Sequence, residues 1–241
     1  MEKEKLFSED AFDKRLSIGD ELSFVKNELR KLRIDLTWAG TDLDVCAFLL
    51  DENGLIREKS DLVFYNSQLR WKTRKEFSDP DFNPLDGERS TWPAPGFRNP
   101  RKWMERTLPL STDGSVIGSW DDMAEDDEDD DDKQETLHVL LDDVDVKRYS
   151  SIVLAAAVAP DRILRGETFA DAHNPVATIY NAQNNEGELI AEYKLAAIAP
   201  GKDAVCFGKL EWDQKAFVWK FIPLAEGYNG GMEYLAREVF D

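Results

Sequence analysis

Two aspartates at the start of an apolar run constrain the fold of this chain more than any other feature. Asp42 and Asp44 lead directly into the apolar residues 45–50, which the turn-forming residues 51–54 close. An apolar run of this length between turn signals predicts a buried β-strand. Because side chains alternate across a strand, we expect both carboxylates on one face, with Cα atoms about 6.6 Å apart. Such a pair must stay hydrated, take up a proton or bind a cation.

Strand-like patterns recur along the rest of the chain. Alternating or continuous apolar residues predict strands at 16–25, 32–38, 45–50, a segment ending at 66, 136–141, 151–158, 175–180, 188–194, 204–210 and 217–222. Residues 230–240 instead carry apolar side chains at helical spacing. Many short strands with frequent turns predict an all-β fold, a β-sandwich with hairpin connections and a short C-terminal helix.

Residues 68–110 interrupt this pattern. Six prolines alternate there with tryptophans and basic residues, which predicts a long inserted loop within one domain that spans residues 1–241. Trp71, Trp92 and Trp103 argue against disorder, because disordered segments are poor in aromatic residues. We expect part of the insertion to pack on the sandwich or to form a partner-binding face. The alternative, that the tryptophans only cap turns of the loop itself, stays open.

An acidic loop is predicted over residues 113–135. Residues 125–132 are eight successive acids, and the formal net charge is −19. Neighbouring carboxylates in such a run lie well within the Debye length of about 8 Å, so the free segment should be extended. It is either a solvated loop or a cation-binding loop. The negative charge repels nucleic acid and attracts cations and basic partners, so we expect no direct nucleic-acid binding.

The two cysteines and the hydropathy of the chain indicate a cytoplasmic protein. Cys46 and Cys206 lie in apolar runs without a C-x-x-C motif, as small buried hydrophobic residues of a reducing compartment do. No stretch approaches the ~18 apolar residues of a membrane span, and the first residues lack a secretory signal pattern. His138 stands alone in a predicted strand, which favours a structural role over metal binding.

A series of short sequence blocks runs through most of residues 16–240. The blocks are Trp38, Asp42 with Asp44, residues 47–50, Asn53 with Gly54, residues 64–66, residues 113–116, Phe169, Val176 with Ala177, Asn181, Phe207 with Gly208, residues 218–221 and residues 227–231. In this order they resemble the TerD family of bacterial stress-response and tellurium-resistance proteins. The resemblance implies a cytoplasmic, calcium-binding β-sandwich that is not known for catalysis and that acts with protein partners of a stress-response complex. Two features depart from the family: the unbroken acid run and the length of the insertion.

The same resemblance would bring several oxygen donors to one end of the sandwich. Calcium takes six to eight oxygen ligands from carboxylates, amides and carbonyls. The expected calcium ligands are Asp42, Asp44, Asn66, Asp113, Asp121 and Asp122.

Two other classes of function compete with calcium binding. The chain has no nucleophile elbow, phosphate-binding loop or dinucleotide fingerprint, so we expect no enzyme, although paired carboxylates can also perform glycoside hydrolysis. An acidic partner-binding protein or DNA mimic without a specific metal site is the other alternative. Calcium titration separates these hypotheses, because the stability of a mimic should respond to ionic strength rather than to calcium.

Overall fold

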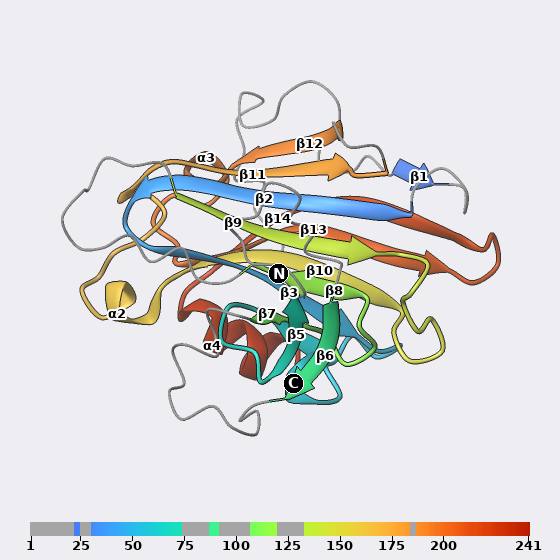
Figure 1. The fold of residues 1–241 in the computed structure, drawn as a ribbon. Coiled ribbons are helices and arrows are strands. Elements are labelled where there is room, and N and C mark those ends of the chain that lie inside the picture. The colour runs from blue at the N-terminus through green and yellow to red at the C-terminus, as the bar shows by residue number, and fades with distance from the viewer. Residues whose placement is uncertain (1–21, 25–29, 74–86, 92–106, 120–132, 184–186) are drawn as a thin grey trace.

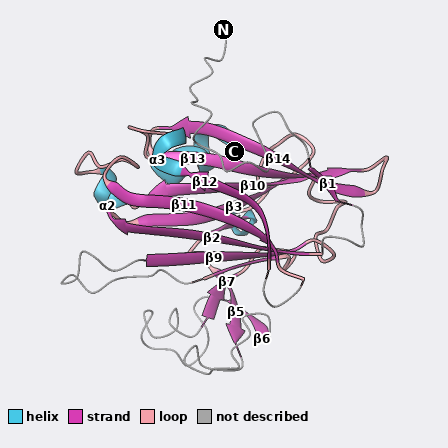
Figure 2. Ribbon diagram, turned by 90° about the horizontal axis from the view of Figure 1, so that it is seen from above, coloured by secondary structure: helices cyan, strands magenta, loops and turns pink. Residues whose placement is uncertain are grey.

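The computed structural model describes residues 22–24, 30–73, 87–91, 107–119, 133–183 and 187–241. Two antiparallel sheets form a sandwich, and a third, smaller sheet lies outside it (Figures 1 and 2). Sheet A has the order β12 (Glu188–Lys194), β11 (Ala172–Asn181), β2 (Lys31–Gly40), β9 (Lys133–Leu140) and β8 (Val116–Gly118). Sheet B has the order β1 (Leu22–Phe24), β14 (Val218–Tyr228), β13 (Ala204–Asp213), β10 (Ser151–Val158), β3 (Leu43–Leu50) and β4 (Leu62–Val63). These strands confirm the predicted all-β fold.

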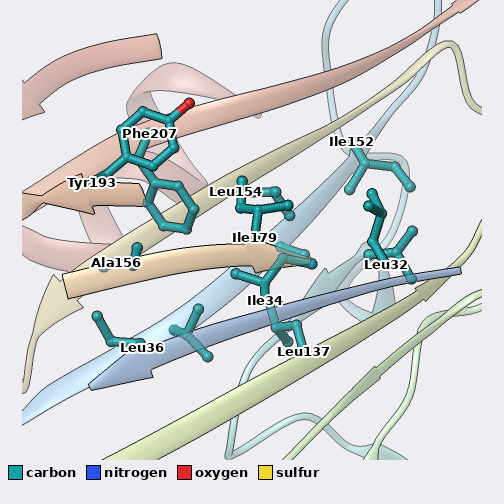
Figure 3. Packing of buried hydrophobic residues seen from close by; sticks show 14 of the residues in the cluster. Leu32, Ile34, Leu36, Leu137, Ile152, Leu154, Ala156, Ile179, Tyr193 and Phe207 are labelled. Carbon is teal, nitrogen blue, oxygen red and sulfur yellow. The ribbon is translucent and has the colours of Figure 1, made fainter. Parts of the chain in front are cut away.

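The main core lies between sheets A and B. Strand β2 shows the expected alternation, with Leu32, Ile34 and Leu36 fully buried, and Figure 3 shows them facing residues of sheet B such as Leu154. The connections carry short helical segments: η2 (Lys59–Asp61), α2 (Pro160–Ile163) and α3 (Leu195–Ile198). No helix in the described ranges is long and apolar enough to cross a membrane.

The outer face of sheet B is also buried, because the C-terminal helix covers it (Figure 1). This helix comprises α4 (Gly231–Tyr234) and the π-helical segment η3 (Leu235–Val239). Phe240 follows it, with its ring centroid 4.6 Å from that of Phe48, and its carbonyl accepts the N–H of Ile56 at 2.7 Å. Residues 45–50 of β3 and residues 152–158 of β10 are therefore apolar and buried on both faces, which confirms the buried strand predicted for 45–50.

Cys46 and Cys206 lie beneath this helix. Both are free and buried, which confirms their interpretation as small core residues. Each lies opposite Ala155 on β10, one from either side. Their backbones are two strand spacings apart, roughly 9.6 Å, whereas a disulfide needs Cα atoms within about 7 Å.

Two glycines fix the start of the C-terminal helix. Gly230 and Gly231 have φ values of +106° and +63°, which residues with a side chain rarely adopt. Asp203 Oδ1 accepts the N–H groups of both glycines, at 2.7 and 2.8 Å. A Cβ on Gly231 would lie 2.6 Å from Ile163 Cδ1. The last two glycines of the sequence block 227–231 are thus explained by the backbone conformation at the start of this helix.

The segment 68–110, expected as an inserted loop, contains three strands. They form sheet C, with the order β6 (Gly87–Thr91), β5 (Leu69–Thr73) and β7 (Thr107–Pro109). Trp71 packs against a cluster that includes Ile117 of sheet A. Part of the insertion therefore packs on the sandwich, as one of the two hypotheses for it required. Trp92 and Trp103 lie outside the described residues.

Candidate functional site

Strand β9 connects two ends of the sandwich that both carry carboxylates. Lys133, its first residue, lies opposite Trp38, where β2 leads toward Asp42. Leu140, its last residue, donates its N–H to Ser115 O at 2.7 Å, close to Asp113. Eight residues of strand separate these two ends by about 23 Å. We name them the Asp42 end and the Asp113 end.

Asp42 lies in the short connection between β2 and β3. Its carbonyl accepts the N–H of Ala159 at 2.9 Å, which ties it to the start of α2. Its Oδ1 atom is buried and accepts no hydrogen bond from the residues described, although Lys133 Nζ lies 3.8 Å away. Burial raises the pKa of the Asp42 carboxyl, while Lys133 and then Arg162 act in the opposite direction. Asp42 is thus a carboxylate shielded from water, and nearby cations favour its charged form.

Asp44, on β3, is only 2% exposed. By strand alternation it lies on the outer face of sheet B, in phase with Cys46 and Phe48. Burial raises the pKa of the Cys46 thiol, and Cys206, Asp44 and Glu135 add to this rise. The negative charges of Asp44 and Glu135 therefore act on the same part of β3.

Glu135 is a buried carboxylate near the Asp42 end that the sequence analysis missed. It is 2% exposed on β9, and its Oε2 accepts the N–H of Val45 at 2.7 Å. Strand β4 pairs only with Ala47 and Phe48, so it leaves this N–H on the open edge of β3. The signal was present in the sequence, because Glu135 alternates in phase with the buried residues Leu137 and Val139.

The other predicted calcium ligands are Asn66, Asp113, Asp121 and Asp122, and they do not share one position in the fold. Asn66 is exposed in the turn after β4, where Ser67 donates its N–H to Phe64 O at 3.0 Å. Asp121 and Asp122 lie outside the described residues. Lys133, which follows their segment, is at the Asp42 end, whereas Ser119, which precedes it, donates its N–H to Thr136 O at 2.7 Å, near the middle of β9.

Asp113 lies at the opposite end and has a structural role. Its Oδ1 accepts hydrogen bonds from the hydroxyls of Ser111 and Ser115, each at 2.7 Å, and from the Ser115 N–H at 3.0 Å. Its Oδ2 accepts the N–H of Asp145 at 3.0 Å. The structure therefore does not bring Asp113 together with Asp42 and Asp44.

Asp61, also at the Asp113 end, shows how this fold satisfies a carboxylate without a cation from solvent. It is fully buried, and its oxygens accept the hydroxyls of Thr112 at 2.8 Å and Tyr149 at 2.5 Å. The N–H groups of Arg57 and Glu58 complete the set, each at 3.1 Å. Asp42 Oδ1 has no comparable set of donors among the described residues.

The described ranges contain no group of three or more His, Cys, Asp or Glu side chains that could hold a metal ion. Asp42, Asp44 and Glu135 alone do not form a complete metal site. Further donors would have to come from other oxygen-bearing residues such as Asn66 or from the segments outside these ranges.

The fold and this end of the molecule define an acidic antiparallel β-sandwich with shielded carboxylates where β2, β3 and β9 meet. The chain belongs to the TerD family, since the TerD domain matches residues 14–76 and 108–239. The unmatched residues 77–107 fall within the predicted insertion.

Comparisons with individual proteins agree with this assignment. The tellurium resistance protein TerD of Serratia marcescens is 26% identical over 226 residues, which cover 90% of this chain and 92% of that protein. A crystal structure of a TerD homologue from Streptomyces coelicolor A3(2) has a TM-score of 0.51 at 13% identity, over 88% of this chain and 97% of that one. A protein of unknown function has the same TM-score at 17% identity, over 88% of this chain and 96% of that one. At these identities the two crystal structures establish the fold alone.

Proposed function

We propose that this chain is a calcium-binding, non-catalytic interaction module of the tellurium-resistance type that acts in the cytoplasm. The observation that carries the proposal is Asp42, whose buried Oδ1 has no hydrogen-bond donor among the described residues. Family membership supports the tellurium-resistance class. The charge of −19 supports partners with basic surfaces, namely proteins of a stress-response complex.

The donor chemistry at the Asp42 end suits calcium. Asp42 and Asp44 offer carboxylate oxygens, and calcium prefers such ligands in a tolerant geometry. Asn66 and the acids Asp121 and Asp122 are the proposed additional donors. Asp113 is not among the proposed calcium ligands, because its oxygens accept hydrogen bonds within the turn at the Asp113 end. A bound dication would relieve the repulsion between these carboxylates and stabilise the folded state.

One observation favours a second candidate function, an acidic partner-binding module without a specific metal site. Lys133 already places a positive charge 3.8 Å from Asp42 Oδ1. In that case the carboxylates at this end would be neutralised within the chain, and stability would respond to ionic strength rather than to calcium.

Calorimetric titration with calcium, with magnesium as competitor, tests the proposal. The double variant Asp42→Asn/Asp44→Asn should remain folded, because repulsion between carboxylates falls, and should lose most calcium binding. At a hundredfold excess over the dissociation constant, calcium should stabilise the parent by about 2.7 kcal/mol. Calcium should therefore raise the melting temperature of the parent but not that of the double variant.

A matched control is Asp142→Asn/Asp143→Asn, which makes the same charge change at two exposed residues of the Asp113 end. It should retain calcium binding. If the Asp42→Asn/Asp44→Asn variant responds to calcium as the parent does, the site lies elsewhere.

A further inference from the structure

Lys133 is positioned by strand register. It is the first residue of β9 and lies opposite Trp38, two residues before the end of β2. It alternates in phase with Glu135 and Leu137, both of which are buried. The register therefore directs the Lys133 side chain toward the connection that carries Asp42.

The Lys133–Asp42 pair is shielded from solvent. The side chains are 14% and 25% exposed, and Nζ lies 3.8 Å from Oδ1. This distance is too long for a hydrogen bond, so the attraction is one between charges. Arg162, the other cation that acts on Asp42, lies 3.8 Å from Asp161 Oδ2 and so has a carboxylate of its own. Lys133 is thus the main counterion of Asp42 in the described part of the chain.

We propose that Lys133 is an internal cation that competes with calcium for Asp42 and thereby sets the calcium affinity of this chain. The inference rests on the proposed function. The ammonium group takes the place that a dication would otherwise hold beside Oδ1, so calcium must either displace it or bind a few ångströms from a like charge. At such separations the repulsion is strong even at an effective dielectric constant of about 20. The affinity is therefore lower than the carboxylates alone would give, and the calcium-free fold is more stable.

The test compares full-length variants by calcium titration calorimetry and by melting in chelator. Lys133→Gln and Lys133→Met remove the charge, Lys133→Arg keeps it, and Lys215→Gln is the matched control. Lys215 is exposed in the β13–β14 turn at the Asp113 end and its N–H donates to Asp213, so its removal changes the net charge equally but far from Asp42. The second neutral variant, Lys133→Met, retains the apolar stem should Lys133→Gln fail to fold.

Neutral variants at position 133 should bind calcium about tenfold more tightly than the parent, while Lys133→Arg and Lys215→Gln should stay within about twofold. In chelator, the neutral variants at 133 should melt below Lys215→Gln, because Asp42 has lost its counterion. Calcium binding that is detected for Lys133→Gln and Lys133→Met but not for the parent would also support the inference.

Equal dissociation constants for the parent, Lys133→Gln and Lys133→Met would overturn the role of Lys133 and leave calcium binding intact. If none of the proteins binds calcium, the proposed function fails and the competition fails with it.

Discussion

Individual buried polar groups in this fold differ in how they are satisfied. Asp61 accepts four hydrogen bonds, and Arg148 lies 3.6 Å from its Oδ2. His138 is the opposite case: it lies on the outer face of sheet A, opposite Arg33 and Ile117, and its buried Nδ1 makes no hydrogen bond to the described residues. Burial lowers the pKa of His138 to about 4, and Lys31 and Arg33 add to the effect. His138, for which we predicted a structural role, thus makes the stability of the fold depend on pH.

Stability should fall on acidification because of His138. The folded-state pKa of about 4 lies below the ordinary value of 6.5, so the unfolded chain takes up the proton first as the pH falls. The contribution is fully present above pH 6.5 and is lost between there and about pH 4, on the order of 2–3 kcal/mol. Urea unfolding from pH 7 to 4 should show this loss in the parent and a smaller one in His138→Gln.

His173→Gln is the control, since His173 is the other histidine of the chain and is exposed. It should follow the parent across the range. An unchanged pH dependence in His138→Gln would mean that other groups cause the acid sensitivity.

Among the secondary-structure elements, the C-terminal helix depends on its first residue for its position. Gly231 has a positive φ, and a Cβ there would approach Ile163 Cδ1 to 2.6 Å. Because this helix covers the outer face of sheet B, its displacement would expose the cluster around Cys46 and Cys206.

Gly231→Ala should therefore speed the reaction of the two buried cysteines with a thiol reagent under native conditions. Gly201→Ala is the matched control, since Gly201 has a φ of +72° but a Cβ added there would meet no atom within 4 Å, so the change adds backbone strain without a clash. We expect Gly231→Ala to lose at least ~1 kcal/mol more stability than the control. Equal labelling rates in both variants would show that the helix tolerates the contact.

Periodicity predicted most elements of the sandwich but not those of sheet C. Strand β2 is long and alternates against a buried face, and β10 and the first half of β13 are continuous apolar runs, so their sequences carry the signal. In contrast, β7 has three residues and ends in a proline, and β4 has two residues, too few for a period to show.

The candidate site was predictable in part for the same reason. Asp42 and Asp44 stand next to a strong strand signal, whereas the position of Asp113 follows from the pairing of β8 with β9, which a sequence pattern does not encode. Glu135 and Lys133 were missed because a charged residue in a strand is expected to face solvent, whereas strand register places these two toward β3 and Asp42.

At the scale of the whole molecule, the sandwich is complete without most of the insertion. The TerD domain matches both sides of residues 77–107, and the residues that the structure describes in the core between sheets A and B all lie outside that range. A deletion within the insertion should retain Thr107, because its carbonyl accepts a hydrogen bond from the buried Arg70 at 2.7 Å.

Replacing residues 77–106 by a short Gly-Ser linker should leave a protein that unfolds in one cooperative transition. The reason is that β5 and β7 pair antiparallel, with Lys72 opposite Thr107, so a few residues can close the gap. Thermal unfolding followed by circular dichroism checks this outcome. A broad, non-cooperative melt would mean that the deleted residues are part of the folding unit, contrary to the predicted single domain with an excursion.

The pairing of β5 with β7 also bears on how this chain could have diverged. Two neighbouring strands hold the exit and the return of the excursion side by side, so material can be added or removed between them without altering the register of sheets A and B. Lineages can therefore lengthen, shorten or exchange this segment while the sandwich is inherited unchanged. For the same reason, a fluorescent domain or an affinity tag could be grafted there.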